Sequence, residues 1–250
     1  MAEKTKERYH LLDTIRGITL ISMIAYHASW DLVYIAGVNW PWYMSRQAFY
    51  WQQSICWTFI LLSGFCMVFS RHWLKRGLTV FAGGALVTLV TLAVLPQDRV
   101  VFGVLTFLGT AMLLAGALEG VLDRIPPAAG VAASALLFAL CRNINRGYLG
   151  FGRIRLMLPG TLYRNLLTAF FGFPAPEFFS TDYFSLLPWI FLFFCGCFAG
   201  RLALKKGWLK HPCMYYNIPV LSLPGRHSLL IYLVHQPVIY LVFAIAENVR

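Results

Sequence analysis

Long apolar runs separated by short polar segments make up most of this chain. A membrane-spanning helix needs about 20 predominantly apolar residues, and a window of that kind fits seven stretches. The stretches are Leu11–Tyr34, Trp51–Ser70, Gly77–Leu95, Val100–Leu118, Ile125–Cys141, Tyr183–Gly200 and Ser228–Ala246. The pattern predicts an all-α, polytopic membrane helix bundle with about seven transmembrane helices.

The segment Arg142–Asp182 does not fit this pattern. Its run MLPGTLYRNLLTAFFGF is apolar enough to enter a membrane, yet the segment also carries arginines at positions 142, 146, 153, 155 and 164. We expect an interfacial or re-entrant element here, and an eighth span is left open.

Composition also points to a membrane protein. Only 12% of the 250 residues are charged and the mean hydropathy is +0.65, whereas soluble domains carry about 25% charged residues. No linker of biased composition divides the chain, so we expect one domain over residues 1–250. The net charge of +11 fits basic loops facing anionic lipid, or a site for an anionic substrate, and needs no nucleic acid. The basic residues of the short loops favour a cytoplasmic N-terminus.

Cysteines and small residues indicate packing rather than metal chemistry. The six cysteines lie mostly inside apolar runs and form no CxxC motif, so we expect buried thiols with no metal site. Gly196 and Gly200 form a GxxxG motif, and Ser63 and Gly64 are adjacent in the second span. Both pairs are suited to close helix packing.

The first span carries ionisable side chains that a bilayer disfavours. The run LDTIRGITLISMIAYHASW places Asp13, Arg16 and His27 in or beside one apolar helix, although such a group at the bilayer centre costs about 2.5–3.5 kcal/mol. We therefore expect a polar site around this helix, in an enzyme or a transporter. Asp13 and Arg16 are one turn apart and should pair, either as an interfacial helix start or with Arg16 reaching an anionic ligand.

His27 is the candidate catalytic residue. It lies roughly 16 Å along the helix from Arg16, and Asp31 follows one turn later on the same face. A carboxylate that orients an imidazole allows it to act as a general base or a nucleophile. The alternative is a packed, hydrogen-bonded histidine without a chemical role.

Other ionisable residues extend the candidate site. Arg71, Lys75 and Arg76 follow the second span, where they are either interfacial anchors or a phosphate-binding patch. Asp182, before the sixth span, and His235, in the seventh, are expected to contact the substrate. For His235 we favour a hydrogen bond to a neighbouring helix over catalysis.

Five stretches of the chain resemble a known family. They are LDTIRGITLISMIAYH, FILLSGFCMVFSR, GVLTFLGTAMLLAG, DYFSLLPWIFLFFCGCFAGR and GRHSLLIYLVHQPV. In this order they are similar to the heparan-alpha-glucosaminide N-acetyltransferase catalytic-domain family, specifically its short bacterial members. The Arg-Gly…His spacing also resembles membrane acyltransferase family three, whose members modify surface polysaccharides.

The resemblance implies an integral membrane acyltransferase of the bacterial cytoplasmic membrane. Such proteins move an acyl group from cytoplasmic acetyl-CoA or another acyl-CoA to an amine or hydroxyl of a sugar, glycan or other acceptor across the membrane. His27 matches the catalytic histidine of that family and Arg16 its Arg-Gly motif. We expect Arg16, Arg71, Lys75 and Arg76 to hold the CoA phosphates. The lysosomal members are longer, so their glucosamine substrate is not carried over.

Other classes of function fit the same residues. A transporter or flippase of an anionic small molecule or lipid-linked sugar would also place Arg and His in its spans. A haem-binding electron carrier would use His27 and His235 as axial ligands, and a membrane scaffold is a further reading. Membrane lipid is an expected partner in every case, and a homo-oligomer is left open.

Overall fold

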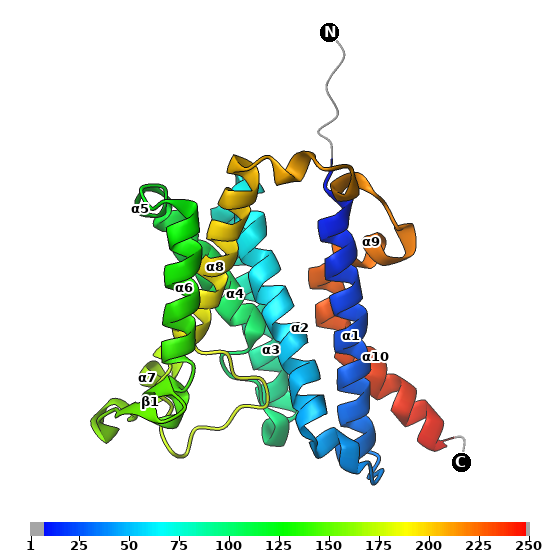
Figure 1. Ribbon diagram of the computed structural model, residues 1–250. Helices are drawn as coiled ribbons and strands as arrows, with labels where there is room; N and C mark the ends of the chain where they lie inside the picture. The colour runs from blue at the N-terminus through cyan, green and yellow to red at the C-terminus, as the bar shows by residue number, and fades with distance from the viewer. Residues whose placement is uncertain (1–7, 249–250) are drawn as a thin grey trace. The chain divides into compact units, whose positions relative to one another are not determined.

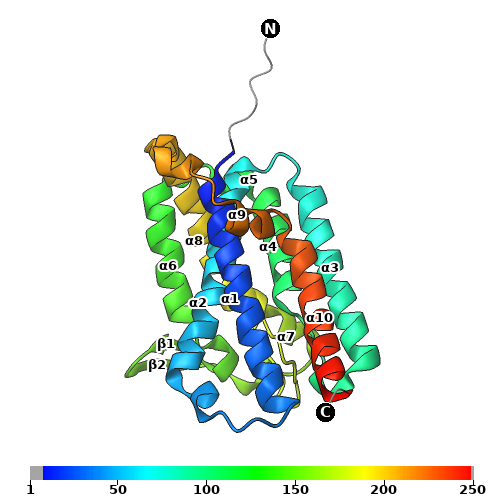
Figure 2. The same cartoon turned by 90° about the vertical axis from the view of Figure 1, so that its right-hand side faces the viewer.

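The computed structural model describes residues 8–248, which are mostly helical (Figures 1 and 2). The chain divides into two compact units. Unit 1 combines Met1–Phe59 with Gly207–Arg250, and unit 2 is Ile60–Lys206. The expectation of one domain over the whole chain stays a prediction.

Unit 1 is organised around the long helix α1 (His10–Tyr34). Its buried apolar cluster contains Leu20 and Met23 of this helix together with Ile55. The other elements of unit 1 are η1 (Pro41–Met44), the first part of α2 (Arg46–Phe65), η6 (Trp208–Lys210), η7 (Pro212–Tyr215), α9 (Pro219–Arg226) and α10 (Ser228–Asn248).

Helix α9 lies directly against α1 (Figure 1). A methyl group on Gly17 would overlap the carbonyl oxygen of Leu221, and a methyl group on Gly225 would overlap the carbonyl oxygen of Asp13. The two helices therefore pack backbone against backbone, and this close approach requires glycine at both positions.

Unit 2 contains two closely packed helix pairs, α3 with α4 and α6 with α8. Its buried core includes Phe107, Ala111 and Phe193. The elements that follow α2 in this unit are η2 (Cys66–Phe69), α3 (Trp73–Val94), η3 (Pro96–Asp98), α4 (Val104–Ala117), α5 (Glu119–Leu122), α6 (Pro127–Cys141), η4 (Ile144–Arg146), β1 (Tyr148–Phe151), β2 (Ile154–Met157), η5 (Gly160–Leu162), α7 (Leu166–Phe171) and α8 (Leu186–Lys205).

Small residues bring the end of α2 against α8, as their spacing predicts. A methyl group on Gly196 would overlap the carbonyl oxygen of Leu61, and a methyl group on Gly64 would overlap that of Phe193. The contact is thus made by backbone on both helices, which is the role that the GxxxG motif predicts.

A helix is present at each of the seven predicted spans, but the number that cross a membrane is not confirmed. Four helical stretches of the described chain are long and apolar enough to do so, and α4 and residues 228–243 of α10 are shorter. The four stretches are Arg46–Phe69, Trp73–Val94, Pro127–Arg146 and Leu186–Lys205. Large apolar side chains on α3, such as Leu89 and Val94, are exposed, as expected for a lipid-facing surface.

The segment Arg142–Asp182 contains a β-hairpin and short helices. Strands β1 and β2 pair antiparallel, with Phe151 opposite Ile154, and the tight turn includes Gly152 at φ +61°. Its longest helix, α7, has six residues, far fewer than the approximately 20 that a span needs. The segment therefore contains no eighth spanning helix. Ile154, Leu156 and Met157 are exposed, which suits the predicted interfacial position.

The six cysteines are free thiols. Cys66 and Cys197 are buried, as expected for thiols inside apolar runs. Cys213 differs because it is exposed, and its Sγ lies 3.0 Å from Nδ1 of His211.

Candidate functional site

Two histidines from opposite ends of the sequence meet in unit 1. His27 comes from α1 and His235 from α10, and their ring centroids are 5.0 Å apart. The side chain of His27 is half-buried, and that of His235 is buried. The structure therefore brings together the proposed catalytic residue and one of the two proposed substrate-binding residues.

A buried carboxylate lies on the same face of α1. Asp31 follows His27 by one helical turn and is fully buried. Nε2 of Gln236 donates hydrogen bonds to both of its oxygens, each at 3.0 Å. A buried carboxylate requires such donors because its desolvation is otherwise costly. The role of Gln236 was not foreseen from the sequence, where its position beside His235 in an apolar run was the available signal.

The tautomer of His235 is set by its own helix. Nδ1 of His235 lies 2.6 Å from the carbonyl oxygen of Tyr232. A carbonyl oxygen only accepts hydrogen bonds, so the proton of the neutral ring resides on Nδ1. The other ring nitrogen, Nε2, is buried and has no hydrogen-bond partner within the described chain.

Aromatic side chains pack beside His27. Tyr26 contacts Trp51 edge-on at a centroid distance of 5.2 Å and Tyr43 at 5.3 Å. The indole N–H of Trp51 donates to Oγ of Ser22 at 2.8 Å. Burial raises the pKa of Tyr43 above its ordinary value, so this hydroxyl stays protonated at neutral pH. These aromatic side chains thus pack together at the α1 turn that carries His27.

A second polar cluster lies at the start of α1. Asp13 forms an ion pair with Arg16 at 3.3 Å, which confirms the predicted pairing one turn apart. It also pairs with Arg8 at 2.6 Å and with Arg226 at 3.7 Å. Arg16 additionally lies 3.5 Å from the carbonyl oxygen of Gly225. The cluster thus links α1 to α9 at the start of α1. The binding of an anionic ligand by Arg16 stays a prediction.

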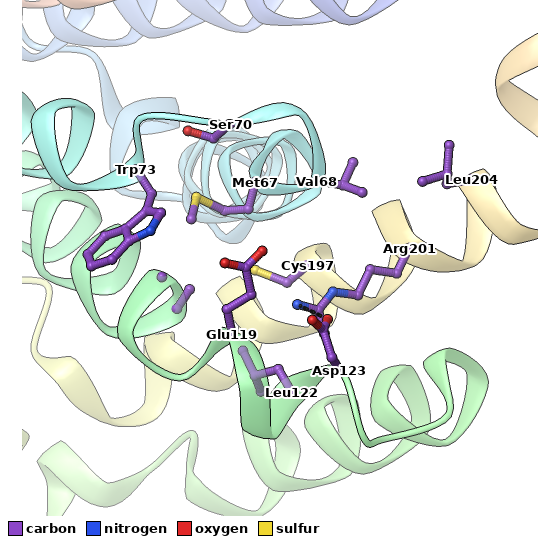
Figure 3. A pocket seen from close by; sticks show the side chains of 12 residues that line it. Met67, Val68, Ser70, Trp73, Glu119, Leu122, Asp123, Cys197, Arg201 and Leu204 are labelled. Atoms are coloured by element: carbon purple, nitrogen blue, oxygen red, sulfur yellow. Dashed lines mark ion pairs between the residues drawn. The ribbon is translucent and has the colours of Figure 1, made fainter.

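The remaining basic residues lie in unit 2, where Arg71, Lys75 and Arg76 are exposed around the start of α3. Ser70 and Trp73, on either side of Arg71 in the sequence, line a cavity of about 240 Å³. Figure 3 shows the side chain of Arg201 and those of Glu119 and Asp123 in the wall of this cavity.

Charged side chains form part of the wall of this cavity. Arg201 and Asp123 form an ion pair at 2.9 Å, drawn as a dashed line in Figure 3. Nη1 of Arg201 is buried without a hydrogen-bond partner in the described part of the protein. The cavity therefore combines apolar side chains with one cationic donor and two carboxylates.

Asp182 has a structural contact in unit 2. Its Oδ2 accepts a hydrogen bond from the backbone N–H of Val104, the first residue of α4, at 3.0 Å. The neighbouring Ser180 accepts a hydrogen bond from the N–H of Val101 at 2.9 Å. The carboxylate thus satisfies a backbone donor at a helix start, where negative charge is favourable. Its proposed contact with substrate stays a prediction.

Replacing Asp182 with alanine should lower the free energy of unfolding by about 0.5–2 kcal/mol, because α4 then loses a capping acceptor. The midpoint of thermal unfolding in detergent measures the effect. Glu177→Ala removes an exposed carboxylate from the same segment and should leave the midpoint unchanged. An unchanged midpoint for Asp182→Ala, together with lost activity, would contradict the capping role and support contact with substrate.

The described residues contain no group of three or more His, Cys, Asp or Glu side chains that could hold a metal ion. The side chains that come together around His27 and His235 carry imidazole and carboxylate groups. Such a set is suited to proton transfer and to nucleophilic attack on a carbonyl carbon.

The chain was compared with protein families, curated proteins and solved structures. The family model for the catalytic part of heparan-alpha-glucosaminide N-acetyltransferase matches residues 8–237, which is most of the chain. No curated protein and no solved structure matches the chain. The matched range contains both histidines and both polar clusters described above.

Proposed function

The chain belongs to the heparan-alpha-glucosaminide N-acetyltransferase catalytic family, and from this membership we propose that it is a membrane acyltransferase that uses acyl-CoA. The donor is acetyl-CoA or another acyl-CoA on the cytoplasmic side. The acceptor is an amine or hydroxyl of a sugar, glycan or other small molecule on the far side. The proposal includes a bacterial cytoplasmic membrane and a cytoplasmic N-terminus.

The observation that supports the proposal most directly is the contact between the rings of His27 and His235, with the buried Asp31 one turn along α1 from His27. Acyl transfer from a thioester needs a base for the attacking group, or a nucleophile that holds the acyl group. His27 is suited to either role because its ring is half-buried and lies next to a second imidazole. Asp31 lies one helical turn from His27 on α1 and is held in place by Gln236 of α10.

The CoA moiety is proposed to bind through basic side chains. CoA carries several phosphate charges, and arginine offers paired donors that match phosphate geometry. Arg71, Lys75 and Arg76 are exposed together at the start of α3, and this clustering supports their assignment. Arg16 is proposed as a fourth contact on the basis of the Arg-Gly motif.

The test of the proposed function is a calorimetric titration of acetyl-CoA, with CoA as comparison, into detergent-purified protein. Saturable binding, followed by release of CoA from acetyl-CoA, is the expected result. A folded, monodisperse protein that binds neither compound would overturn the proposal. Exchange of an anionic solute across vesicles without chemistry would instead support the transporter alternative.

Replacing Arg71 or Arg76 with alanine should raise the KM for acetyl-CoA about tenfold or more, because a hydrogen bond to a charged group is worth about 1.5–3 kcal/mol. The kcat should change little, since these residues lie outside the reacting groups. Steady-state kinetics at two salt concentrations measures both effects, and Arg153→Ala, an exposed arginine in the hairpin, is the matched control. A lower kcat with an unchanged KM would contradict the assignment.

A further inference from the structure

One hydrogen bond defines the tautomer of the neutral His235 ring. Because Nδ1 donates to the carbonyl oxygen of Tyr232 at 2.6 Å, the neutral ring carries its lone pair on Nε2. This nitrogen is buried and unpartnered within the described chain, and the residue is only 9% exposed. His235 is therefore held as a hydrogen-bond acceptor that lacks a donor.

A buried acceptor without a donor is unfavourable, at about 1–3 kcal/mol. Buried polar groups nearly always have a hydrogen-bond partner, and a donor group on a bound substrate would supply one here. The ring of His27 lies 5.0 Å away between centroids, so a group that reacts at His27 also lies within reach of His235. A hydroxyl or amine is the donor that an acceptor molecule would bring to this position.

Unlike Nε2 of His235, the carboxylate of Asp31 has a hydrogen-bond donor within the protein. Both of its oxygens accept hydrogen bonds from Gln236, the residue that follows His235. The side chain of Asp31 is thus held against the α10 turn that carries His235.

We propose that Nε2 of His235 is the general base that takes the proton of the acceptor, while His27 carries the acyl group. This inference rests on the proposed function and goes beyond it by dividing the two steps of the reaction between two histidines. It also goes beyond the expectation from the sequence, in which a hydrogen bond from His235 to a neighbouring helix is favoured over catalysis.

In the first step, a ring nitrogen of His27 attacks the thioester carbonyl carbon. A C–N bond forms, the C–S bond breaks, and CoA leaves as the thiolate. In the second step, the acceptor oxygen or nitrogen attacks the same carbon as its proton moves to Nε2 of His235. The C–N bond to His27 breaks with return of its electron pair to the ring. His235 then gives its proton to the CoA thiolate or to water, so acyl-CoA and acceptor are the only reactants.

The test compares two nucleophiles that differ in their need for a base. Water must lose a proton as it attacks, whereas neutral hydroxylamine attacks an acyl-imidazole without help. His235→Asn is the informative variant, because its amide nitrogen replaces Nδ1 as donor to Tyr232 while nothing replaces Nε2. Purified protein receives radiolabelled acetyl-CoA, and the formation of acetate and of acetohydroxamate is measured with and without hydroxylamine.

We expect His235→Asn to lower acetate formation about 10²–10⁴-fold, the usual contribution of general base catalysis, and acetohydroxamate formation by less than about tenfold. Label should also accumulate on the variant when hydroxylamine is absent. His227→Asn makes the same change at an exposed histidine of unit 1 and should behave as wild type, and His27→Ala gives the background rate of hydroxylamine with acetyl-CoA.

Two results would overturn the inference while leaving the proposed function intact. One is equal loss of both products, which indicates a structural role for His235, and the other is wild-type rates for both. A wild-type protein that forms neither product above background would refute the proposed function itself, and the division of steps with it.

Discussion

Replacing His27 with alanine should abolish acyl transfer, with a loss of about 10³-fold or more, while acetyl-CoA still binds. The loss is expected because the imidazole either holds the acyl group or removes a proton, and alanine does neither. Binding should survive because the CoA phosphates are proposed to contact basic residues elsewhere. Radiolabelled acetyl-CoA measures turnover, and calorimetric titration of the same preparations measures affinity.

The control for this variant is His227→Ala, an exposed histidine in the same unit. It should retain the turnover of the wild type. Normal turnover in His27→Ala would show that the site is assigned to the wrong residue, even though the family membership stands. Loss of binding as well as turnover would place His27 in the binding of CoA instead.

Replacing Gly17 with alanine should destabilise the protein by about 3 kcal/mol, at the upper end of the cost of overpacking. The new methyl group would overlap the backbone oxygen of Leu221. A flexible side chain could rotate away, but a backbone oxygen within a helix moves only if α9 moves with it. We expect a lower midpoint of thermal unfolding and a smaller yield of monodisperse protein.

The matched control is Gly120→Ala in α5. A methyl group there would have no neighbour within 4 Å, and alanine is favoured over glycine in a helix by up to about 1 kcal/mol. Gly120→Ala should therefore be neutral or slightly stabilising. Equal midpoints for the two variants would show that α1 and α9 do not pack as closely as their backbones indicate.

The helices were predictable because a bilayer permits few alternatives. Each apolar run of suitable length must satisfy its own backbone hydrogen bonds, and a helix does so within one segment. Local spacing also predicted the pairing of Asp13 with Arg16, which depends only on one turn of helix. The same rule placed His27 and Asp31 on one face of α1. These successes all concern residues within a few positions of one another.

The contacts that complete the site join distant parts of the chain. Gln236 binds Asp31 across 205 positions, and Arg226 reaches Asp13 from the other end of the sequence. Helical periodicity carries no information about such pairings. The tautomer of His235 could not be predicted either, because it depends on the ring orientation that brings Nδ1 to the carbonyl oxygen of Tyr232. The sequence therefore predicts pairs of neighbouring residues better than contacts between distant parts of the chain.

The exposed thiol of Cys213 offers a chemical marker for the sidedness of the protein. The other five cysteines are buried or half-buried, so a bulky maleimide that cannot cross membranes should react first at this position. In sealed vesicles of known orientation, labelling reports which aqueous compartment the loop before α9 faces. The native chain thus carries its own topology probe, and no cysteine needs to be introduced for the purpose.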